Sequence, residues 1–441
     1  MRALIDKLVH YKDKDYQHYS FLKESQYWSQ EQLRQYQFDK LCELWEHAVN
    51  HVPYYRNIAE KNNLRNLSNW DDFHRIPVLT KRIVRENFKL LQADNIPANR
   101  FLPNSTSGST GSNFHFYSDA NSFSFQRALT LRKFDMMGLS YPSCRKLIVW
   151  GASFDVKKAT ETLWDRTKLF LHNSKIISEY DLSEEGMDKI IKMISKYSPD
   201  AFQSYPSILM HLAHYIEKNN LNVFIPVVHT GGEKLYVEQR EIIEKAFHCK
   251  LYDFYGARDM PMVGMSCSES NKIHVFQEQV VFEVLDGDNN VVDNGEGDIV
   301  LTDLNNFVMP FIRYQIGDRA RICSSSNKCS CGRNLQQIDE ILGRKFDILT
   351  FTNGKSVGGT FWTLLLRSVP GIMDFQVVQE ERDVLRINYI ADGILSDQDQ
   401  QKLIEQIKKY CGNNVVTVFD AITKLPVTKA GKRQFVISKV Q

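Results

Sequence analysis

Residues 105–116 read STSGSTGSNFHF, a stretch in which two glycines stand among serines and threonines. A loop of this composition can present backbone N–H groups and hydroxyls to a polyphosphate with no bulky side chain in the way. The stretch lacks the GKS or GKT ending of a P-loop NTPase and the GxGxxG order of a dinucleotide-binding turn. Taken alone, it fits either a phosphate-binding loop or a flexible surface connection, so its meaning depends on the segments around it.

The segments that surround this loop alternate between short apolar runs and helix-like stretches. From about residue 100 to 320, runs such as KLIVWGA (146–152) alternate with stretches such as LYVEQREIIEKAF (235–247). This pattern predicts α/β layering with parallel strands. Residues 280–304 predict hairpins instead, because GDNN and NGEG are turn clusters between β-branched runs.

The N-terminal region has the periodicity of an amphipathic helix at residues 33–52. We expect this helix to pack on the larger body, and a membrane-surface helix is the alternative. Its apolar face would carry Leu33, Phe38, Leu41, Leu44, Trp45 and Ala48.

The length of the chain, 441 residues, predicts at least two domains, because single cores tend to divide above roughly 250–300 residues. After Gly343 the pattern changes to a small βαβ-like unit. We therefore expect a large α/β domain with layered sheets at residues 1–343 and a small α+β domain at residues 344–441.

Composition excludes several classes of function. A formal net charge of +2 is too small for a nucleic-acid-binding surface, so no nucleic-acid partner is expected. The apolar runs fall short of the roughly 20 residues that span a bilayer, and the first residues lack a signal-peptide core, which predicts a cytoplasmic protein. Eight cysteines in such a chain indicate thiols or metal ligands in place of a disulfide framework.

Five later segments fit one scheme with the glycine-rich loop. They read HTGGEKL (229–235), DFYGARDM (253–260), GDIVLTDLNNFVMPFIRYQIGDRARI (297–322), GRKFDIL (343–349) and LPVTKAGKRQF (425–435). With these segments and WSQEQLRQYQFDKLCELWEHAVNHVPYYR (28–56), essentially the whole chain resembles the adenylate-forming ligase superfamily. Within it, the chain looks like the phenylacetate–CoA ligase branch with its CapK-type relatives of surface-polysaccharide gene clusters. The resemblance implies a large adenylation domain and a small, mobile C-terminal lid.

The resemblance assigns nucleotide binding to several segments. Glycines at 231 and 232 would let the backbone run along adenine, and the carboxylate of Asp318 would accept the two ribose hydroxyls. A tight turn and a turn aspartate are the structural alternatives. The residues implied for ATP or AMP are Thr106, Ser107, Gly108, Ser109, Thr110, Gly111, Gly231, Gly232, Glu233, Tyr255, Gly256 and Asp318.

The resemblance also implies the residues that meet charge at the α-phosphate, where attack by a carboxylate builds negative charge. Lys432 matches the lysine that the family's C-terminal domain brings there, and Arg344 matches an arginine that reaches ribose or phosphate. Asp259 stands where the family has a glutamate for Mg²⁺, with a structural Arg258–Asp259 pair as the alternative. Phe346 replaces the charged residue usual at the family's hinge.

The cysteine spacing gives a second signal. Cys329 and Cys331 form a CxCGR unit, and Cys267 precedes His274 in CSESNKIH, so three thiolates and one imidazole could form a tetrahedral zinc site. The resemblance supports this site, since some phenylacetate–CoA ligase-like proteins carry a structural zinc between such segments. Unconnected buried cysteines and a surface histidine are the alternative, and Cys323 is a spare candidate ligand.

The expected function is therefore activation of a small carboxylic acid by ATP and Mg²⁺, giving an acyl-AMP and pyrophosphate. The acyl group would pass to coenzyme A, or to an amino sugar, an amino acid or a carrier thiol, and the CapK-type resemblance implies polysaccharide biosynthesis as the setting. Trp150, Tyr205 and Phe254 are expected to shape the acid pocket. Two alternatives remain: an adenylyltransferase that stops at the AMP adduct, which Phe346 favours, and a nucleotide-binding scaffold without turnover, which Asp259 favours.

Overall fold

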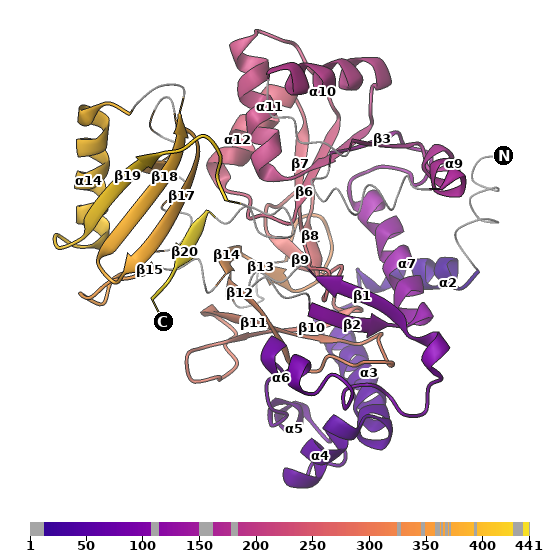
Figure 1. The fold of residues 1–441 in the computed structure, drawn as a ribbon. Coiled ribbons are helices and arrows are strands. Elements are labelled where there is room, and N and C mark those ends of the chain that lie inside the picture. Colours follow the sequence, from indigo (N-terminus) through magenta and orange to yellow (C-terminus); the bar gives the residue numbers. More distant parts are fainter. Residues whose placement is uncertain are drawn as a thin grey trace. The chain divides into compact units, whose positions relative to one another are not determined.

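The computed structural model describes residues 13–106, 114–149, 162–177, 184–323, 328–344, 349–357, 362, 365–366, 369, 372–391, 395–426 and 435–440. Contacts divide these residues into two compact units (Figure 1). The first holds the described residues up to Thr106, from Phe114 to Ile316 and from Ala320 to Glu340. The second holds Gly317–Arg319 and the described residues from Ile341 onward.

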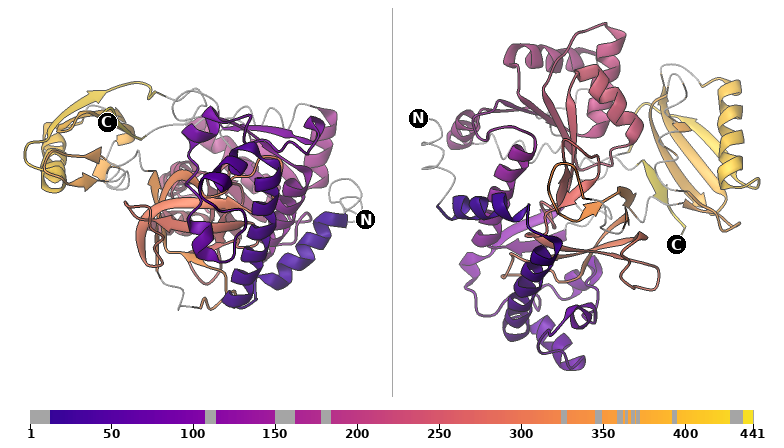
Figure 2. Two further views of the ribbon diagram at one scale, coloured as in Figure 1. Left: turned by 90° about the horizontal axis from the view of Figure 1, so that it is seen from below. Right: turned by 180° about the vertical axis from the view of Figure 1, so that it is seen from behind.

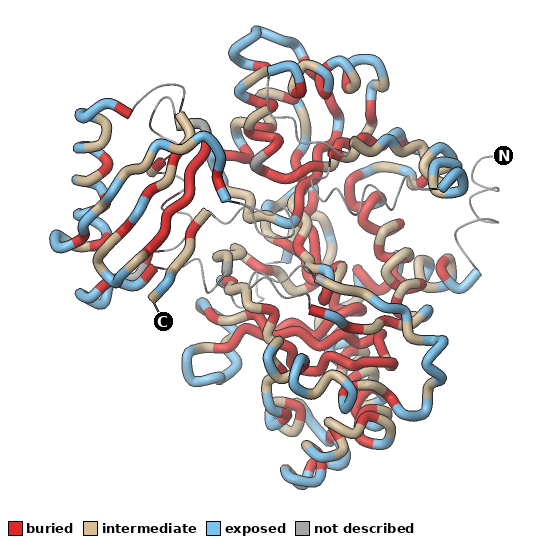
Figure 3. Tube along the Cα trace, viewed as in Figure 1, coloured by how far each residue is buried: buried red, intermediate tan, exposed pale blue. Residues whose placement is uncertain are grey.

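An eight-stranded sheet forms the centre of the first unit, in the order β13-β9-β8-β7-β6-β5-β3-β4. Strands β4, β3, β5, β6 and β7 pair in parallel, and β8, β9 and β13 continue the sheet as antiparallel strands. Strands β3, β5 and β6 are mostly buried, as Figure 3 shows, whereas the edge strand β4 is half-buried or exposed. Their bounds are β3 Lys146–Val149, β4 Ser174–Ile177, β5 Ala201–Ser204, β6 Val227–Gly231, β7 Lys250–Tyr255, β8 Gly264–Ser266, β9 Ile273–Val275 and β13 Gln337–Ile338.

Helices cover both faces of the parallel strands, as the alternating apolar and helix-like segments predict. On one face, α10 (Glu184–Tyr197), α11 (Pro206–Lys218) and α12 (Val237–Phe247) share a core with side chains such as Val228 and Leu251. On the other face, α7 (Ala120–Met136) packs against Val227 and Tyr252, the alternate residues of the same strands. Because successive strand residues point to opposite faces, these strands need continuous apolar runs. A further helix, α9 (Leu163–Leu171), precedes β4.

A second sheet has the order β10-β11-β12-β14. The hairpin predicted at residues 280–304 is confirmed: Val280 pairs with Asp303 and Leu285 with Asp298 in antiparallel register. The strands are β10 Val280–Leu285, β11 Gly295–Asp303, β12 Tyr314–Ile322 and β14 Glu340–Arg344. A separate antiparallel pair, β1 (Leu102–Thr106) and β2 (Phe114–Ser118), flanks the glycine-rich loop and aligns Thr106 with Phe114.

Of the helices in the N-terminal region, α3 lies beside β10 and α2 packs along α7 (Figures 1 and 2). The predicted amphipathic helix is α3, and it packs on the body of the unit through Leu41, Leu44 and Trp45. Gln37 is buried on this face and donates to the carbonyls of Gln277 and Val280. Phe38, which was expected on the buried face, is only half-buried because Gln37 occupies that face. The elements are α2 Asp13–Ser25, α3 Gln30–His51, α4 Pro53–Lys61, α5 Trp70–His74, α6 Lys81–Glu86 and η1 Ala98–Arg100.

A buried polar cluster joins α2 to α7 and to the strand region. Arg132 and Glu278 are both fully buried, and the Arg132 Nη1 atom lies 2.7 Å from Glu278 Oε1. Ser25 donates to the same carboxylate oxygen. An unpaired charge at such depth would cost several kcal/mol, so the pair requires both partners.

The second unit has a four-stranded sheet in the order β19-β18-β17-β20. Strands β17 and β18 form an antiparallel pair, while β19 and β20 join the two edges in parallel. Helix α14 buries Leu403, Ile407 and Cys411 in the core of this unit. The elements are β15 Leu349–Thr350, β16 Ser356–Val357, β17 Ile372–Glu381, β18 Val384–Ala391, α14 Asp397–Cys411, β19 Val416–Ala421 and β20 Val436–Ser438.

The fold is therefore a mixed α/β architecture with a large layered unit and a small α+β unit. Among the described residues, none of the helices combines the length and the apolar character that crossing a bilayer requires.

Candidate active site

The glycine-rich loop begins where β1 ends. The side chain of Arg258 reaches the base of this loop, and its Nη1 atom lies 3.4 Å from the Ser105 carbonyl oxygen. This contact brings the YGARD segment next to Ser105, the first residue of the glycine-rich stretch. The expected site residues that lie outside the described residues are Ser107, Gly108, Ser109, Thr110, Gly111 and Lys432, together with Trp150 and Phe346.

The carboxyl ends of β6 and β7 bring two predicted nucleotide segments side by side. Gly231 is paired with Phe254 in the parallel register, so Gly231–Glu233 and Tyr255–Gly256 leave neighbouring strands at the same edge. In open α/β sheets, this edge is where ligands bind. A Cβ on Gly231 would lie 3.3 Å from the Phe254 ring, and a Cβ on Gly256 would lie 3.3 Å from the same ring. Both glycines thus leave room for one aromatic side chain.

Asp259 is held in a buried polar contact. The Tyr314 hydroxyl donates to Asp259 Oδ2 at 2.6 Å, and the Lys81 Nζ atom lies 3.4 Å from the same oxygen. The Asp259 side chain is only 2% exposed. Lys81 and Tyr314 are therefore partners of Asp259 that the sequence did not predict.

This environment bears on magnesium binding. A nearby ammonium already supplies positive charge to Oδ2, whereas Mg²⁺ prefers several oxygen ligands in octahedral geometry. The described contacts of Asp259 fit an ion pair better than a dication site, so no mechanistic step is assigned to magnesium at this residue. Lys81 and Tyr314 were missed at the sequence level, although Tyr314 lies in the RYQIGD segment that suggested Asp318.

Asp318 and Arg344 belong to strands of the second sheet. Asp318 is half-buried in β12, directly after Gly317, whose φ of +96° is a backbone conformation that favours glycine. Arg344 is the last residue of β14. Contacts assign Asp318 and Arg344 to the second unit, whereas the glycine edge of β6 and β7 belongs to the first unit.

A buried lysine on α7 was not singled out in the sequence. Lys133 is 8% exposed, and its Nζ atom lies 5.1 Å from the centroid of the Phe254 ring. Burial lowers the pKa of Lys133 to about 8. Burial and the charge of Lys133 together lower the pKa of His229, on β6, well below its usual value, so this imidazole is neutral. The feature of the sequence that could have indicated this buried lysine is its place in the helix-like stretch RALTLRKF (127–134), among apolar residues.

The four predicted zinc ligands meet in the first unit. Cys267 follows β8 and His274 lies in β9, while the pairing of Gln337 with His274 brings the CxCGR unit alongside. The Sγ atoms of Cys267 and Cys329 are 3.6 Å apart, and Cys331 Sγ is 3.6 Å from His274 Nε2. All four ligand atoms lie within 4.8 Å of one another.

The chemistry of this cluster fits a tetrahedral Zn²⁺ ion. Burial lowers the pKa of His274 to about 4, so the imidazole is neutral and can donate its lone pair to a metal. Burial raises the pKa of the Cys267 thiol to about 12, which keeps it protonated until a metal displaces the proton. His274 is fully buried, contrary to the surface-histidine alternative, and Cys323 is exposed and outside the group.

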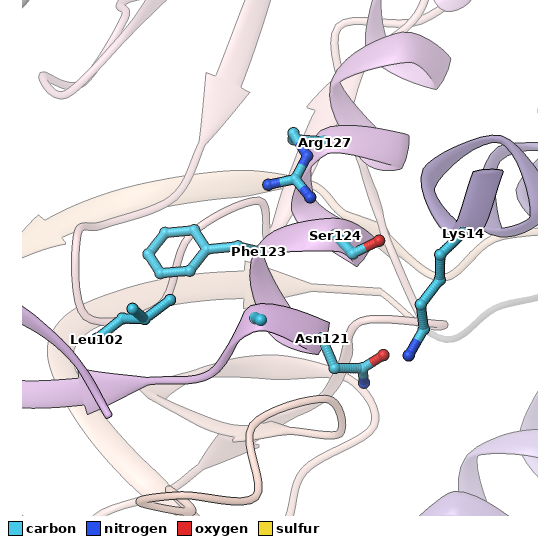
Figure 4. A pocket seen from close by; sticks show the side chains of 7 residues that line it. Lys14, Leu102, Asn121, Phe123, Ser124 and Arg127 are labelled. Atoms are coloured by element: carbon cyan, nitrogen blue, oxygen red, sulfur yellow. The ribbon is translucent and has the colours of Figure 1, made fainter. Parts of the chain in front are cut away.

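A cavity of about 360 Å³ lies away from these sites, beside the start of α7 (Figure 4). It contains none of the predicted nucleotide or metal residues. Within it, Arg127 is already paired with Asp15 at 2.9 Å. The residues that line it are Lys14, Leu102, Ala120, Asn121, Phe123, Ser124 and Arg127.

Solved structures with the same architecture are adenylate-forming enzymes. The chain superposes on 2-hydroxyisobutyryl-CoA ligase in its postadenylation state, in complex with R3-HIB-AMP, with a TM-score of 0.70 and 20% identity over 91% of this chain and 89% of that one. O-succinylbenzoate-CoA synthetase of Bacillus subtilis with AMP gives a TM-score of 0.52 at 13% identity, over 75% and 67% of the two chains. The chain thus has the fold of these ligases, a large α/β unit followed by a small C-terminal unit.

Sequence relatives narrow this class. CapK of Staphylococcus aureus is 25% identical over 93% of this chain and 90% of that protein. The phenylacetate-CoA ligase of Pseudomonas putida is 23% identical, covering 72% of each chain. The family model of the CapK C-terminal domain matches residues 349–439. In sequence and in fold the chain is thus similar to the phenylacetate–CoA ligase-like, CapK-type branch of the adenylate-forming ligases.

Proposed function

We propose that this chain activates a small carboxylic acid with ATP, releases pyrophosphate and transfers the acyl group from acyl-AMP to an acceptor. The observation that carries the proposal is the meeting, in the first unit, of two predicted nucleotide segments with Ser105, the first residue of the glycine-rich stretch. Gly231–Glu233 and Tyr255–Gly256 leave adjacent strands, and Arg258 contacts the carbonyl of Ser105 at the base of the glycine-rich loop. A polyphosphate on the loop and a purine at the strand edge can thereby be parts of one nucleotide.

Each proposed role follows from the chemistry of the side chain. The loop from Thr106 to Gly111 holds the β- and γ-phosphates through N–H groups and hydroxyls. Asp318 accepts the ribose hydroxyls, and Arg344 donates to ribose or phosphate. Lys432 neutralises the charge that builds at the α-phosphate when the carboxylate attacks. Magnesium enters with ATP and supplies further neutralisation of the phosphates.

The acceptor that we favour is a thiol, with coenzyme A as the first candidate. This choice rests on similarity to the phenylacetate-CoA ligases and to 2-hydroxyisobutyryl-CoA ligase, which has been solved with 2-HIB-AMP and CoA. An amine acceptor, such as an amino sugar or amino acid, in polysaccharide biosynthesis is the alternative that the CapK-type resemblance implies. Use of ATP supports a cytoplasmic setting for either reaction.

We further propose that Cys267, His274, Cys329 and Cys331 hold one structural Zn²⁺ ion. Four protein ligands complete a tetrahedral coordination shell and leave no position for substrate. The ion would join β8 and β9 to the CxCGR segment, and it would stabilise the fold without taking part in the chemistry.

The test of the proposed function is exchange of labelled pyrophosphate into ATP across a panel of aryl, fatty, hydroxy and dicarboxylic acids. Exchange that depends on an added acid is the expected result. Purified enzyme that binds ATP and shows no exchange with any acid would favour the non-catalytic scaffold.

A second measurement separates the two kinds of enzyme. With an acid that supports exchange, coenzyme A, amino sugars and amino acids are added one at a time, and AMP release is followed. Formation of one acylated acceptor for each AMP released, with one of these acceptors, supports the ligase. Accumulation of the AMP adduct with none of them supports the adenylyltransferase alternative.

A further inference from the structure

The ammonium group of Lys133 is buried, and none of the described carboxylates forms an ion pair with it. Lys133 lies on the sheet-facing side of α7, and it is 8% exposed. Within the described part of the chain, no carboxylate or carbonyl accepts a hydrogen bond from its Nζ atom. Its close neighbours are the rings of Phe254, 5.1 Å away, and Phe134, 5.5 Å away.

Another buried lysine shows how such a group is normally accommodated in this fold. Lys146 is 4% exposed, and its ammonium donates to the carbonyls of Pro142 at 3.0 Å and Cys144 at 2.9 Å. These bonds replace the lost hydration of the charge. Lys133 has only cation–π contacts, which are worth about 0.5–2 kcal/mol and do not offset the burial of an ammonium. The folded chain therefore retains a buried cation whose electrostatic complement is missing.

The position of Lys133 connects it to the proposed site. Its nearest ring, Phe254, immediately precedes Tyr255, and this ring abuts Gly231 and Gly256 at the nucleotide edge of the sheet. The charge of Lys133 also acts on His229, two residues before Gly231. The ammonium thus lies beside the strand ends where the acyl group would emerge from the adenylate.

The described neighbours of Lys133 include no carboxylate, and this indicates what kind of group would complement its charge. His229 is neutral, and the adjoining rings of Phe134 and Phe254 carry no charge. A ligand that brings its own negative charge would pair with Lys133 in surroundings of low dielectric, where a charged hydrogen bond is strong. A purely aliphatic or aromatic acyl chain would leave the ammonium unpaired.

We propose that Lys133 is a specificity-determining residue that binds a second carboxylate on the acyl substrate, so that the acid activated by this enzyme is a dicarboxylic acid. This inference rests on the proposed function. One carboxylate reacts with ATP, and the other lies against Lys133 at the α7 face of the sheet. The Phe254 ring lies 5.1 Å from the Lys133 ammonium and abuts Gly231 and Gly256, so it connects Lys133 with the glycine edge.

The test compares matched acids in the pyrophosphate-exchange assay. Three sets are used: butyrate, 4-hydroxybutyrate and succinate; hexanoate, 6-hydroxyhexanoate and adipate; benzoate, 4-hydroxybenzoate and terephthalate. In at least one set the wild-type enzyme should prefer the dicarboxylate by tenfold or more in kcat/KM. Lys133→Met, which keeps the length of the side chain and removes its charge, should lower kcat/KM for that dicarboxylate about 10–100-fold. The same change should leave the monocarboxylate unaffected or improve it.

Two controls separate recognition from folding. Lys133→Arg keeps the charge and should retain a preference for the dicarboxylate. The thermal midpoint of Lys133→Met should be equal to or above that of the wild type, because an unpaired buried charge has been removed.

Three results would overturn the inference. A wild-type preference for the monocarboxylate in every set would contradict it. So would an equal loss of activity toward all members of a set in Lys133→Met, which would indicate binding of the reacting carboxylate or a structural role. A preference for hydroxy acids that disappears in Lys133→Met would show that Lys133 binds a neutral hydrogen-bond acceptor on the substrate, and not a second carboxylate. In all three cases acid-dependent exchange persists and the proposed function stands. If none of the acids supports exchange, both the proposed function and this inference are overturned.

Discussion

The Sγ atoms of Cys267 and Cys329 lie 3.6 Å apart, although 62 positions separate them in the chain. Antiparallel pairing of β8 with β9, and of β9 with β13, closes this distance. A thiol whose pKa is raised by burial gains little from lying next to another thiol. The arrangement is therefore best explained by a shared metal ion.

Substitution of two of the ligands tests this explanation. The double change Cys329→Ser/Cys331→Ser should remove about one equivalent of zinc, measured by elemental analysis of purified protein, and should lower the thermal midpoint. Cys323→Ser is the matched control, since this exposed cysteine belongs to the same region and lies outside the cluster. Equal zinc content in the double variant and the control would refute the site.

The contact between Tyr314 and Asp259 predicts a stability effect. Tyr314 is fully buried and donates to a carboxylate oxygen at 2.6 Å, so Tyr314→Phe leaves that oxygen without its hydroxyl donor. The free energy of unfolding should fall by about 1–3 kcal/mol in urea titrations. Tyr27→Phe, at a tyrosine that is 50% exposed, should change it by less than about 0.5 kcal/mol. Similar values for the two variants would show that the buried hydroxyl adds nothing.

Lys432→Ala should lower the rate of acid-dependent pyrophosphate exchange by about 100–1,000-fold, the typical effect of removing one donor that stabilises transition-state charge. Lys429→Ala is the matched control, because it removes the same charge three positions earlier in the segment TKAGKRQF. Exchange that survives in Lys432→Ala, or falls equally in both variants, would contradict the assignment of Lys432.

The stability of the chain should depend on pH through Lys133. Its pKa is lowered to about 8 in the folded chain, against about 10.4 for an unfolded lysine. Between these values the unfolded chain binds more protons than the folded chain, so the contribution of this residue to stability rises with pH. The advantage of Lys133→Met over the wild type in the free energy of unfolding should therefore shrink from pH 8 to pH 10. Urea titrations of both proteins at pH 7, 8, 9 and 10 measure this difference, and a constant difference would refute the lowered pKa.

Much of the fold could be predicted from sequence because it follows from local periodicity. The stretch at 235–247 contains α12, Val237–Phe247, and the turn clusters between 280 and 304 mark the β10–β11 hairpin. Gln37 shows where this approach fails. Its burial in α3 depends on the carbonyls of Gln277 and Val280, and no feature of the helix sequence encodes those distant acceptors.

The candidate site likewise has residues that the sequence predicted and residues that it did not. Ligand types and spacing suggested the Cys/His cluster, because a metal site requires few residue types. The partners of Asp259 were not predictable, since Lys81 and Tyr314 come from α6 and β12 and only tertiary packing brings them to one carboxylate. Lys133 was missed because a single lysine on a helix is normally solvated, and its burial depends on strands more than 90 residues away.

The buried Glu278 has a consequence for the synthesis of the protein. Ser25 on α2 and Glu278 are 253 positions apart, and a ribosome that adds about 5–20 residues per second needs roughly 10–50 s to cover that interval. Throughout this time Leu22 and Leu33, which are fully buried in the finished fold, lack the partners Phe276 and Leu335 that have not yet been made. The nascent N-terminal helices therefore present an apolar face to the cell, and they are the part of the chain where a holding chaperone would act during translation.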